Sequence, residues 1–308
     1  MGVGRNSRGG QMGGIVRIRD LEIGGGDVKI CVPLVSETAG ELMREAAAAV
    51  AAKADLAEWR MDFCRDAGGA AEAIGLIRAL RAALGGIPLL ATFRTTAEGG
   101  NAQGGDSGGN ASGGEYGRAG FGGDGWLEAS RGNGASCESG LEASCGGEGY
   151  ARLLLAVAES GAADAVDVEM SAGEDIARRV IGAAKAAGAV SVASRHYFDG
   201  TPPKAEIASQ LLAMHAAGAD IPKIAAMPSC FGDVLALMSA AYEYTSRAGR
   251  PVIAVSMGQL GCVSRVAGGF FGSAVTFCAA GRGSAPGQLG VREARAAMAL
   301  LGGGRCGG

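Results

Sequence analysis

One lysine and one histidine stand out as residues that could carry out chemistry. Lys223 lies inside an apolar run, residues 221–227, between Pro222 and Ile224. Removal from water lowers the pKa of a lysine, so part of such a side chain is a free amine that attacks carbonyl carbons. His196 follows the preceding apolar run and could transfer protons near neutral pH. The pair indicates chemistry on a carbonyl compound, although a lysine at a strand end can also simply keep its ammonium in water.

Charged side chains recur near the ends of three further apolar runs: Glu58 with Arg60, Arg94 with Glu98, and Asp167 with Glu169. Residues two apart on a strand share one face, so Glu58 points the same way as Arg60, and Asp167 the same way as Glu169, from otherwise apolar segments. Charges that face an apolar interior need partners. They therefore form either a structural ion network or a binding site for a polar molecule.

A third group of polar residues lies near the C-terminus. Arg265 has a planar guanidinium that matches a carboxylate, and Ser284 and Gln288 could complete the hydrogen bonds of such an anion. The segment that carries these two, Ser-Ala-Pro-Gly-Gln, could also be a plain turn.

The elements that must position these residues alternate regularly along the chain. Apolar, β-rich runs cover residues 28–35, 56–63, 87–94, 163–170, 190–195, 221–227, 251–257 and 273–277. Alanine-rich helical stretches separate most of them, at 39–53, 70–84, 150–160, 173–187, 204–217, 233–248 and 291–301. Strict alternation implies a parallel sheet with right-handed crossovers, and eight strands can close. We predict an α/β fold, a (β/α)8 TIM barrel, with a doubly wound open sheet as the alternative.

The barrel is predicted to be a single domain over residues 15–301. Residues 15–23 alternate apolar and polar and lead to a glycine triplet at 24–26, which predicts an N-terminal β-hairpin that closes the bottom of the barrel. After the third strand, 17 of the 49 residues in 101–149 are glycine and the net charge is −5, so we predict a flexible insertion. The glycine-rich ends, 1–14 and 302–308, are predicted to be disordered tails.

Composition excludes several classes of function. The 28 basic and 31 acidic residues give a net charge of −3, so we expect no nucleic-acid partner. No apolar run is long enough to cross a bilayer, so we expect no membrane partner. The eight cysteines are scattered without a C-x-x-C pair, which favours reduced thiols and a cytoplasmic protein.

Eight segments occur in an order that resembles a known family: EWRMD, TFRTTAEGG, DAVDVEM, SRHYFDGTP, GADIPKIAAMP, SMGQLGCVSR, FGSAVTF and SAPGQ. Their order and spacing are similar to those of type I 3-dehydroquinate dehydratases, the Schiff-base enzymes of the shikimate pathway. The resemblance extends over about residues 15–301. The 101–149 insertion departs from it, because relatives have a short connection there.

The resemblance implies a lyase that removes water from 3-dehydroquinate to give 3-dehydroshikimate, the third step toward chorismate and the aromatic amino acids. Lys223 would condense with the C3 ketone, and His196 would take a C2 proton and then protonate the leaving hydroxyl. Glu98 would orient both side chains. The resemblance further implies no metal or organic cofactor, and a homodimer.

The resemblance also assigns six residues to substrate binding. Glu58, Arg60 and Arg94 would hold the ring hydroxyls and neighbouring charges, whereas Arg265, Ser284 and Gln288 would receive the carboxylate. Two other readings remain open: a class I aldolase-like Schiff-base barrel, and a catalytically silent barrel. A biosynthetic and a catabolic, quinate-degrading role also remain open, since both use the same substrate.

Overall fold

The computed structural model describes residues 14–101, 147–281, 283–285 and 287–302. Residues 1–13 of the predicted N-terminal tail, most of the 101–149 insertion and most of the C-terminal tail lie outside these residues.

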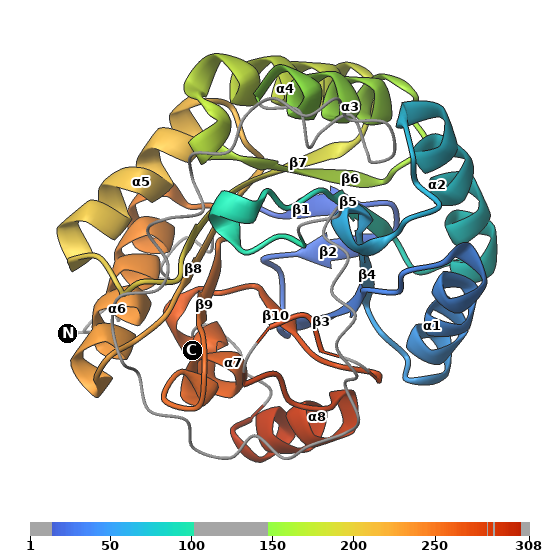
Figure 1. Ribbon diagram of the computed structural model, residues 1–308. Coiled ribbons are helices and arrows are strands. Elements are labelled where there is room, and N and C mark those ends of the chain that lie inside the picture. The colour runs from blue at the N-terminus through green and yellow to red at the C-terminus, as the bar shows by residue number, and fades with distance from the viewer. Residues whose placement is uncertain (1–13, 102–146, 282, 286, 303–308) are drawn as a thin grey trace, which may run out of the picture.

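Eight parallel strands form a nearly closed barrel that surrounds the centre of the molecule (Figure 1). The strands are β3 (Lys29–Leu34), β4 (Leu56–Arg60), β5 (Leu89–Thr92), β6 (Ala165–Glu169), β7 (Val190–Tyr197), β8 (Ile221–Ala226), β9 (Ile253–Ser256) and β10 (Val275–Phe277). They pair in the order β10-β3-β4-β5-β6-β7-β8-β9, which confirms the predicted TIM barrel.

The barrel has a seam between β9 and β10. In the part of the chain that is described, these strands share no ladder, only the isolated bridge between Val252 and Ser273. The Ser273 hydroxyl supplements that bridge, since its oxygen accepts from the Ala254 N–H at 3.0 Å and its O–H donates to the Ala254 carbonyl at 3.2 Å.

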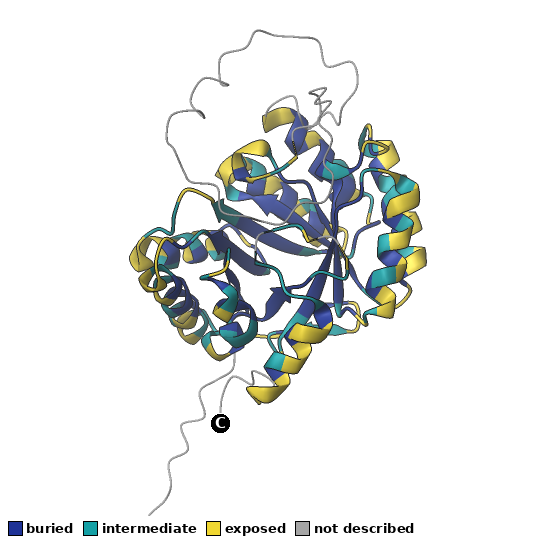
Figure 2. Cartoon of the chain, turned by 60° about the horizontal axis from the view of Figure 1, so that its bottom comes forward, coloured by how far each residue is buried: buried dark blue, intermediate teal, exposed yellow. Residues whose placement is uncertain are grey.

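Helices cover the outside of the barrel, and Figure 2 shows exposed residues along their outer faces and buried residues along the strands. The helices are α1 (Ala39–Ala51), α2 (Ala70–Leu84), α3 (Gly147–Glu159), α4 (Glu174–Ala186), α5 (Lys204–Ala216), α6 (Phe231–Ala248), α7 (Cys262–Ala267) and α8 (Val291–Leu300). Helix α3 begins three residues before the predicted 150, inside the predicted insertion. Helix α7, between β9 and β10, was not predicted. No helix among the described residues is long and apolar enough to cross a membrane.

The predicted N-terminal hairpin is present, but its turn was placed wrongly. Strand β1 (Val16–Ile18) pairs antiparallel with β2 (Leu21–Ile23), so the chain reverses at Arg19 and Asp20 rather than at the glycine triplet. Arg19 takes a left-handed φ of 54°, which a two-residue turn of this kind requires. Gly24 and Gly26, with φ of 89° and 81°, instead redirect the chain into β3.

Two apolar clusters stabilise the barrel. The larger lies between the strands and the surrounding helices. The smaller fills the barrel interior with one or two residues from most of the strands, including Leu56, Leu90 and Ile221, and includes Ile18 and Ile23 of the hairpin. The hairpin therefore closes the N-terminal end of the barrel, and the opposite end stays available for a site.

Candidate active site

A cavity of about 260 Å³ lies at the end of the barrel where the strands terminate. All nine residues predicted to be catalytic or substrate-binding line it, whereas Asp167 and Glu169 do not. The sixteen lining residues are Glu58, Arg60, Arg94, Glu98, Gly99, His196, Phe198, Lys223, Ala225, Val255, Met257, Arg265, Phe277, Ser284, Ala285 and Gln288. These residues come from β4, β7, β8, β9, β10, α7 and the connecting loops. The parallel barrel thus gathers side chains that are far apart in the sequence.

Lys223 is buried on β8, with 4 % of its surface exposed. Its Nζ lies 3.0 Å from Asp167 Oδ2 and 3.2 Å from Glu58 Oε1, and 4.7 Å from the centre of the Phe277 ring. The sequence predicted the loss of water around this ammonium but not its two carboxylate partners. Because they compensate for burial, the resting lysine is a paired ammonium that must lose a proton before it can attack.

Asp167 is the most enclosed of the carboxylates around the lysine. Besides Lys223 it receives Arg94 Nη2 at 3.1 Å and the Ser194 hydroxyl at 2.6 Å. Burial alone would raise the pKa of Asp167, but the charges of Arg94 and Lys223 outweigh it and hold that pKa below its usual range. Asp167 is therefore a permanent negative charge beneath the lysine.

Arg94 serves mainly as the counterion of this network. Its Nη1 donates to Glu169 Oε1 at 3.1 Å and to the Ser194 hydroxyl at 2.8 Å. Although burial opposes its charge, Asp167 and Glu169 raise the pKa of the guanidinium. The side chain reaches the cavity wall, yet its donors are largely used within the protein.

His196 and Glu98 form a close pair beside the lysine. His196 Nδ1 lies 2.9 Å from Glu98 Oε2, and the backbone N–H of His196 donates to the same oxygen at 3.1 Å. Burial, with the charges of Arg94 and Lys223, holds the pKa of His196 well below its usual range. The imidazole is therefore neutral at neutral pH and able to accept a proton.

Glu98 is held by the short helical turn Thr96–Glu98 and is itself buried. Burial, reinforced by the charge of Glu169, raises the pKa of Glu98 to about 7. The Ser171 hydroxyl donates to Glu98 Oε1 and so fixes the second carboxylate oxygen. Glu98 therefore gains and loses its proton near neutral pH.

Arg60 is locked rather than free to move. Its Nε and Nη2 donate to Asp62 Oδ1 and Oδ2 at 2.8 and 2.7 Å. Asp62 also accepts from the backbone N–H groups of Arg94 at 3.2 Å and Asn101 at 3.0 Å. The carboxylate therefore fixes the position of Arg60 and fastens the β5 loop to the end of β4.

Arg265 lines the cavity from the unpredicted helix α7. It is 2 % exposed, its Nη1 donates to the Phe277 carbonyl at 3.3 Å, and burial lowers its pKa. Ser284 and Gln288 bind each other across a tight loop, through Ser284 N to Gln288 Oε1 at 2.8 Å and Gln288 Nε2 to Ser284 Oγ at 3.1 Å. Together with Arg265, these two side chains can receive an anion, and Ser284 and Ala285 of the Ser-Ala-Pro-Gly segment line the cavity.

The sequence contained an unused signal for several wall residues. Ala225 follows Lys223 by two positions on β8. Phe198 and Met257 come directly after β7 and β9, two positions after His196 and Val255. Period-two alternation therefore places all three on the cavity side. Ser194 carries the same signal, since it lies two positions before His196 on β7. Ser171 gave none, because it follows β6 and its contact with Glu98 comes from a different loop.

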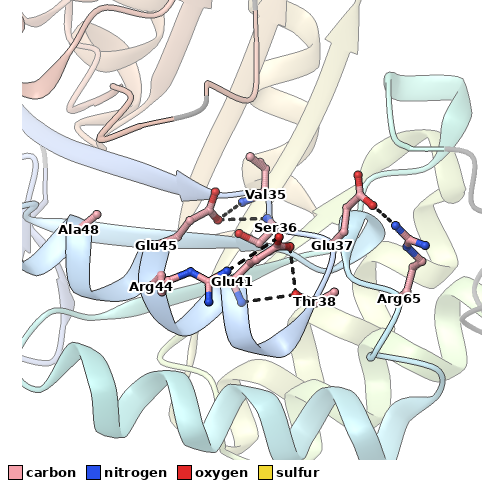
Figure 3. A pocket seen from close by; sticks show the side chains of 9 residues that line it. All are labelled: Val35, Ser36, Glu37, Thr38, Glu41, Arg44, Glu45, Ala48 and Arg65. Atoms are coloured by element: carbon pink, nitrogen blue, oxygen red, sulfur yellow. Dashed lines mark hydrogen bonds and ion pairs between the residues drawn. The ribbon is translucent and has the colours of Figure 1, made fainter. Parts of the chain in front are cut away.

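A second, larger hollow of about 530 Å³ lies at the end of β3 beside α1 (Figure 3). Its charges are satisfied locally: Arg65 pairs with Glu37, and Glu45 Oε2 accepts from the N–H groups of Val35 and Ser36 at 2.7 and 3.0 Å. Glu45 thus anchors the end of β3. This hollow contains no lysine, histidine or buried ion network, so it lacks the reactive groups of the barrel cavity.

Comparison with known proteins gives consistent relatives. A model of the type I 3-dehydroquinase family matches residues 30–109 and 137–305. The 3-dehydroquinate dehydratase of Listeria monocytogenes serotype 4b (strain F2365) is 36% identical over 286 residues, covering 93% of this chain and 97% of its own.

Solved structures agree with the sequence relatives. The 3-dehydroquinate dehydratase of Geobacillus kaustophilus superposes with a TM-score of 0.78 at 31% identity, over 95% of this chain and 98% of that one. The type I enzyme of Clostridium difficile, solved with covalently modified comenic acid, gives 0.76 at 33% identity, over 94% and 98%. With the barrel, the cavity and these relatives in agreement, the chain belongs to the type I 3-dehydroquinase family.

Proposed function

We propose that this protein is a 3-dehydroquinate dehydratase that works through a Schiff base on Lys223. The observation that carries the proposal is the grouping of a buried lysine, a neutral histidine and a buried arginine around one cavity of small-molecule size. 3-Dehydroquinate is a hydroxylated ketone with a carboxylate, and it needs these three groups.

In the proposed first stage, Lys223 loses a proton to a neighbouring base and its lone pair attacks the C3 carbonyl. The carbinolamine takes up a proton and loses water, which leaves a C=N bond with a positive charge on nitrogen. This iminium ion withdraws electrons from C2 and makes its hydrogens acidic.

In the second stage, His196 takes a proton from C2, and the electron pair moves to form an enamine. The enamine electrons then expel the C1 hydroxyl, which leaves as water with the proton from His196. Water hydrolyses the conjugated iminium, which releases 3-dehydroshikimate and restores Lys223. Glu98 keeps the imidazole in position through its 2.9 Å contact to Nδ1.

The binding roles follow the same geometry. Arg265 with Ser284 and Gln288 would receive the carboxylate, because a planar guanidinium matches it with two parallel hydrogen bonds. Glu58 and Arg60 would hold the ring hydroxyls. Arg94 would act from behind through its ion pairs with Asp167 and Glu169.

Two measurements test the proposal. Purified enzyme with 3-dehydroquinate should raise the ultraviolet absorbance of the conjugated product, and borohydride added during turnover should leave a reduced adduct on Lys223 that mass spectrometry locates. Lys223→Ala should give neither signal. An adduct with other ketones but no enone product would favour an aldolase-like enzyme, and no adduct with any ketone would favour a silent barrel.

The proposal extends to a cytoplasmic homodimer in the shikimate pathway. Five described cysteines are free, three of them buried, which fits a reducing compartment. Phe231, Leu235 and Tyr242 on α6 are each more than half exposed, and such apolar side chains favour burial against a second subunit. Light scattering of the wild type and of Leu235→Glu tests the dimer, since only the variant should have the mass of one chain.

A further inference from the structure

We propose that Phe277 is a positioning residue for the amine nucleophile, whose ring stabilises the Lys223 nitrogen whenever that nitrogen carries a positive charge. The inference rests on the proposed Schiff-base function. Phe277 ends β10, is 6 % exposed, and lines the cavity with the centre of its ring 4.7 Å from Lys223 Nζ. A cation at this distance is attracted by the negative face of an aromatic ring, most strongly where water is excluded.

The ring and the two carboxylates hold the lysine in different ways. The contacts to Asp167 and Glu58 are N–H hydrogen bonds, and the resting ammonium has three such donors for them. Conversion to the iminium replaces two N–H bonds by a C=N double bond, so one donor remains for two acceptors. The attraction to the ring depends on charge and not on N–H donors. It therefore persists when one of the hydrogen bonds is lost.

This difference gives the ring a specific role in the reaction. The neutral amine and the neutral carbinolamine gain little from the ring, whereas both iminium intermediates gain from it. The resting ammonium is attracted by the ring as well, so the ring does not favour covalent intermediate over resting enzyme. Phe277 should instead favour the iminium over the neutral carbinolamine within the covalent intermediate. A packing residue would instead affect only how stably the protein folds.

The backbone of Phe277 serves the other end of the cavity. Its carbonyl accepts from Arg265 Nη1 at 3.3 Å, so one residue contacts both the nucleophile and the arginine expected to bind the carboxylate. Side-chain substitutions at this position retain the carbonyl. Effects of changing the ring therefore report on the lysine side alone.

The test replaces Phe277 by 4-fluoro-, 3,5-difluoro- and 3,4,5-trifluorophenylalanine, which weaken the negative face of the ring in steps with little change in size. With 3-dehydroquinate at a fixed concentration, the ratio of iminium to carbinolamine in the covalent adduct, which differ by one water in the mass of the intact protein, should fall in equal logarithmic steps, by about tenfold over the series. The melting temperature of the substrate-free enzyme should also fall along the series, because the ring attracts the resting ammonium in the folded state.

Phe93 provides the matched control, because it is also 6 % exposed but contacts the Tyr150 ring, at 6.2 Å between centroids. The same substitutions there should leave the adduct unchanged. A flat series at Phe277, or equal slopes at both positions, would overturn the proposal while leaving the Schiff base intact. Absence of any adduct in the wild type would overturn both.

Discussion

Replacement of Glu98 by glutamine should separate the effect of this buried carboxyl on activity from its effect on the stability of the fold. The amide oxygen can still face His196, and the amide NH2 can donate to the Ser171 hydroxyl, so the local geometry is kept. What disappears is the ionisation. We expect the variant to be less active, because a neutral amide cannot stabilise the imidazolium that forms when His196 takes a proton.

The stability effect follows from the pKa of Glu98, which burial raises from its ordinary 4.5 to about 7. A raised carboxyl pKa means that the folded state binds the proton more tightly than the unfolded state does. Its contribution to stability is therefore complete below pH 4.5 and is lost as the pH rises through 7. As the pH rises from 5 to 8, the ionisation of Glu98 alone lowers the free energy of unfolding by about 2 kcal/mol.

Urea denaturation at pH 5 and pH 8 measures this difference. The raw wild-type profile also contains His196, whose lowered pKa acts in the opposite direction, so the comparison uses the difference between wild type and Glu98→Gln at each pH. Relative to the wild type, the variant should gain about 2 kcal/mol on going from pH 5 to pH 8. Glu293→Gln, at an exposed site, is the control. Parallel profiles for the wild type and Glu98→Gln would refute the reasoning.

Three further substitutions have defined outcomes. The Phe198 ring stacks on His196 with 6.5 Å between centroids, and in Gly99→Ala a residue at φ 81° gains a Cβ that would clash with Phe198 Cζ. Calorimetry should show a loss of about 1 kcal/mol from the backbone alone, and kcat should fall as the ring is displaced from His196. An unchanged kcat would argue against a role for this ring contact. Arg265→Lys keeps the positive charge but loses the two parallel N–H donors that bind a carboxylate. Steady-state kinetics should show a KM raised about tenfold with a smaller change in kcat. An unaltered KM would contradict carboxylate binding by Arg265. Asp62→Asn leaves Arg60 without its buried counterion and should lower the free energy of unfolding, measured in urea, by about 3 kcal/mol. A loss below about 0.5 kcal/mol would contradict a stabilising role for this ion pair.

The barrel and the cavity residues were predictable because both rest on local spacing. Alternating apolar and alanine-rich segments predicted the strands, and polar residues at their ends predicted which side chains meet. The hairpin turn was not predictable in the same way. The alternation of 15–23 is the same wherever the chain reverses, and the glycine triplet is a stronger turn signal than Arg19, which adopts a left-handed conformation.

Other features depend on contacts that no local pattern contains. Asp167 reaches Lys223 from β6 to β8, past the intervening strand β7, and Ser171 reaches Glu98 from a different loop. Such pairs follow only once the strand order is known. Helix α7, with six residues, is shorter than two turns, so it cannot show the 3.6-residue periodicity that predicted the longer helices.

The seam between β9 and β10 has a consequence for how the cavity opens. Lys223 lies on β8, which forms hydrogen-bonded ladders with both β7 and β9. Arg265 lies on helix α7, which connects β9 to β10, and among the described residues these two strands are joined by one bridge and the Ser273 side chain. Segments with few backbone hydrogen bonds open locally at lower cost than those in continuous ladders. The two ends of the cavity therefore open on different time scales, and amide hydrogen exchange should be faster in β10 than in β8. A substrate joined to the lysine would stay attached to the slowly exchanging end while its anionic end binds and releases repeatedly.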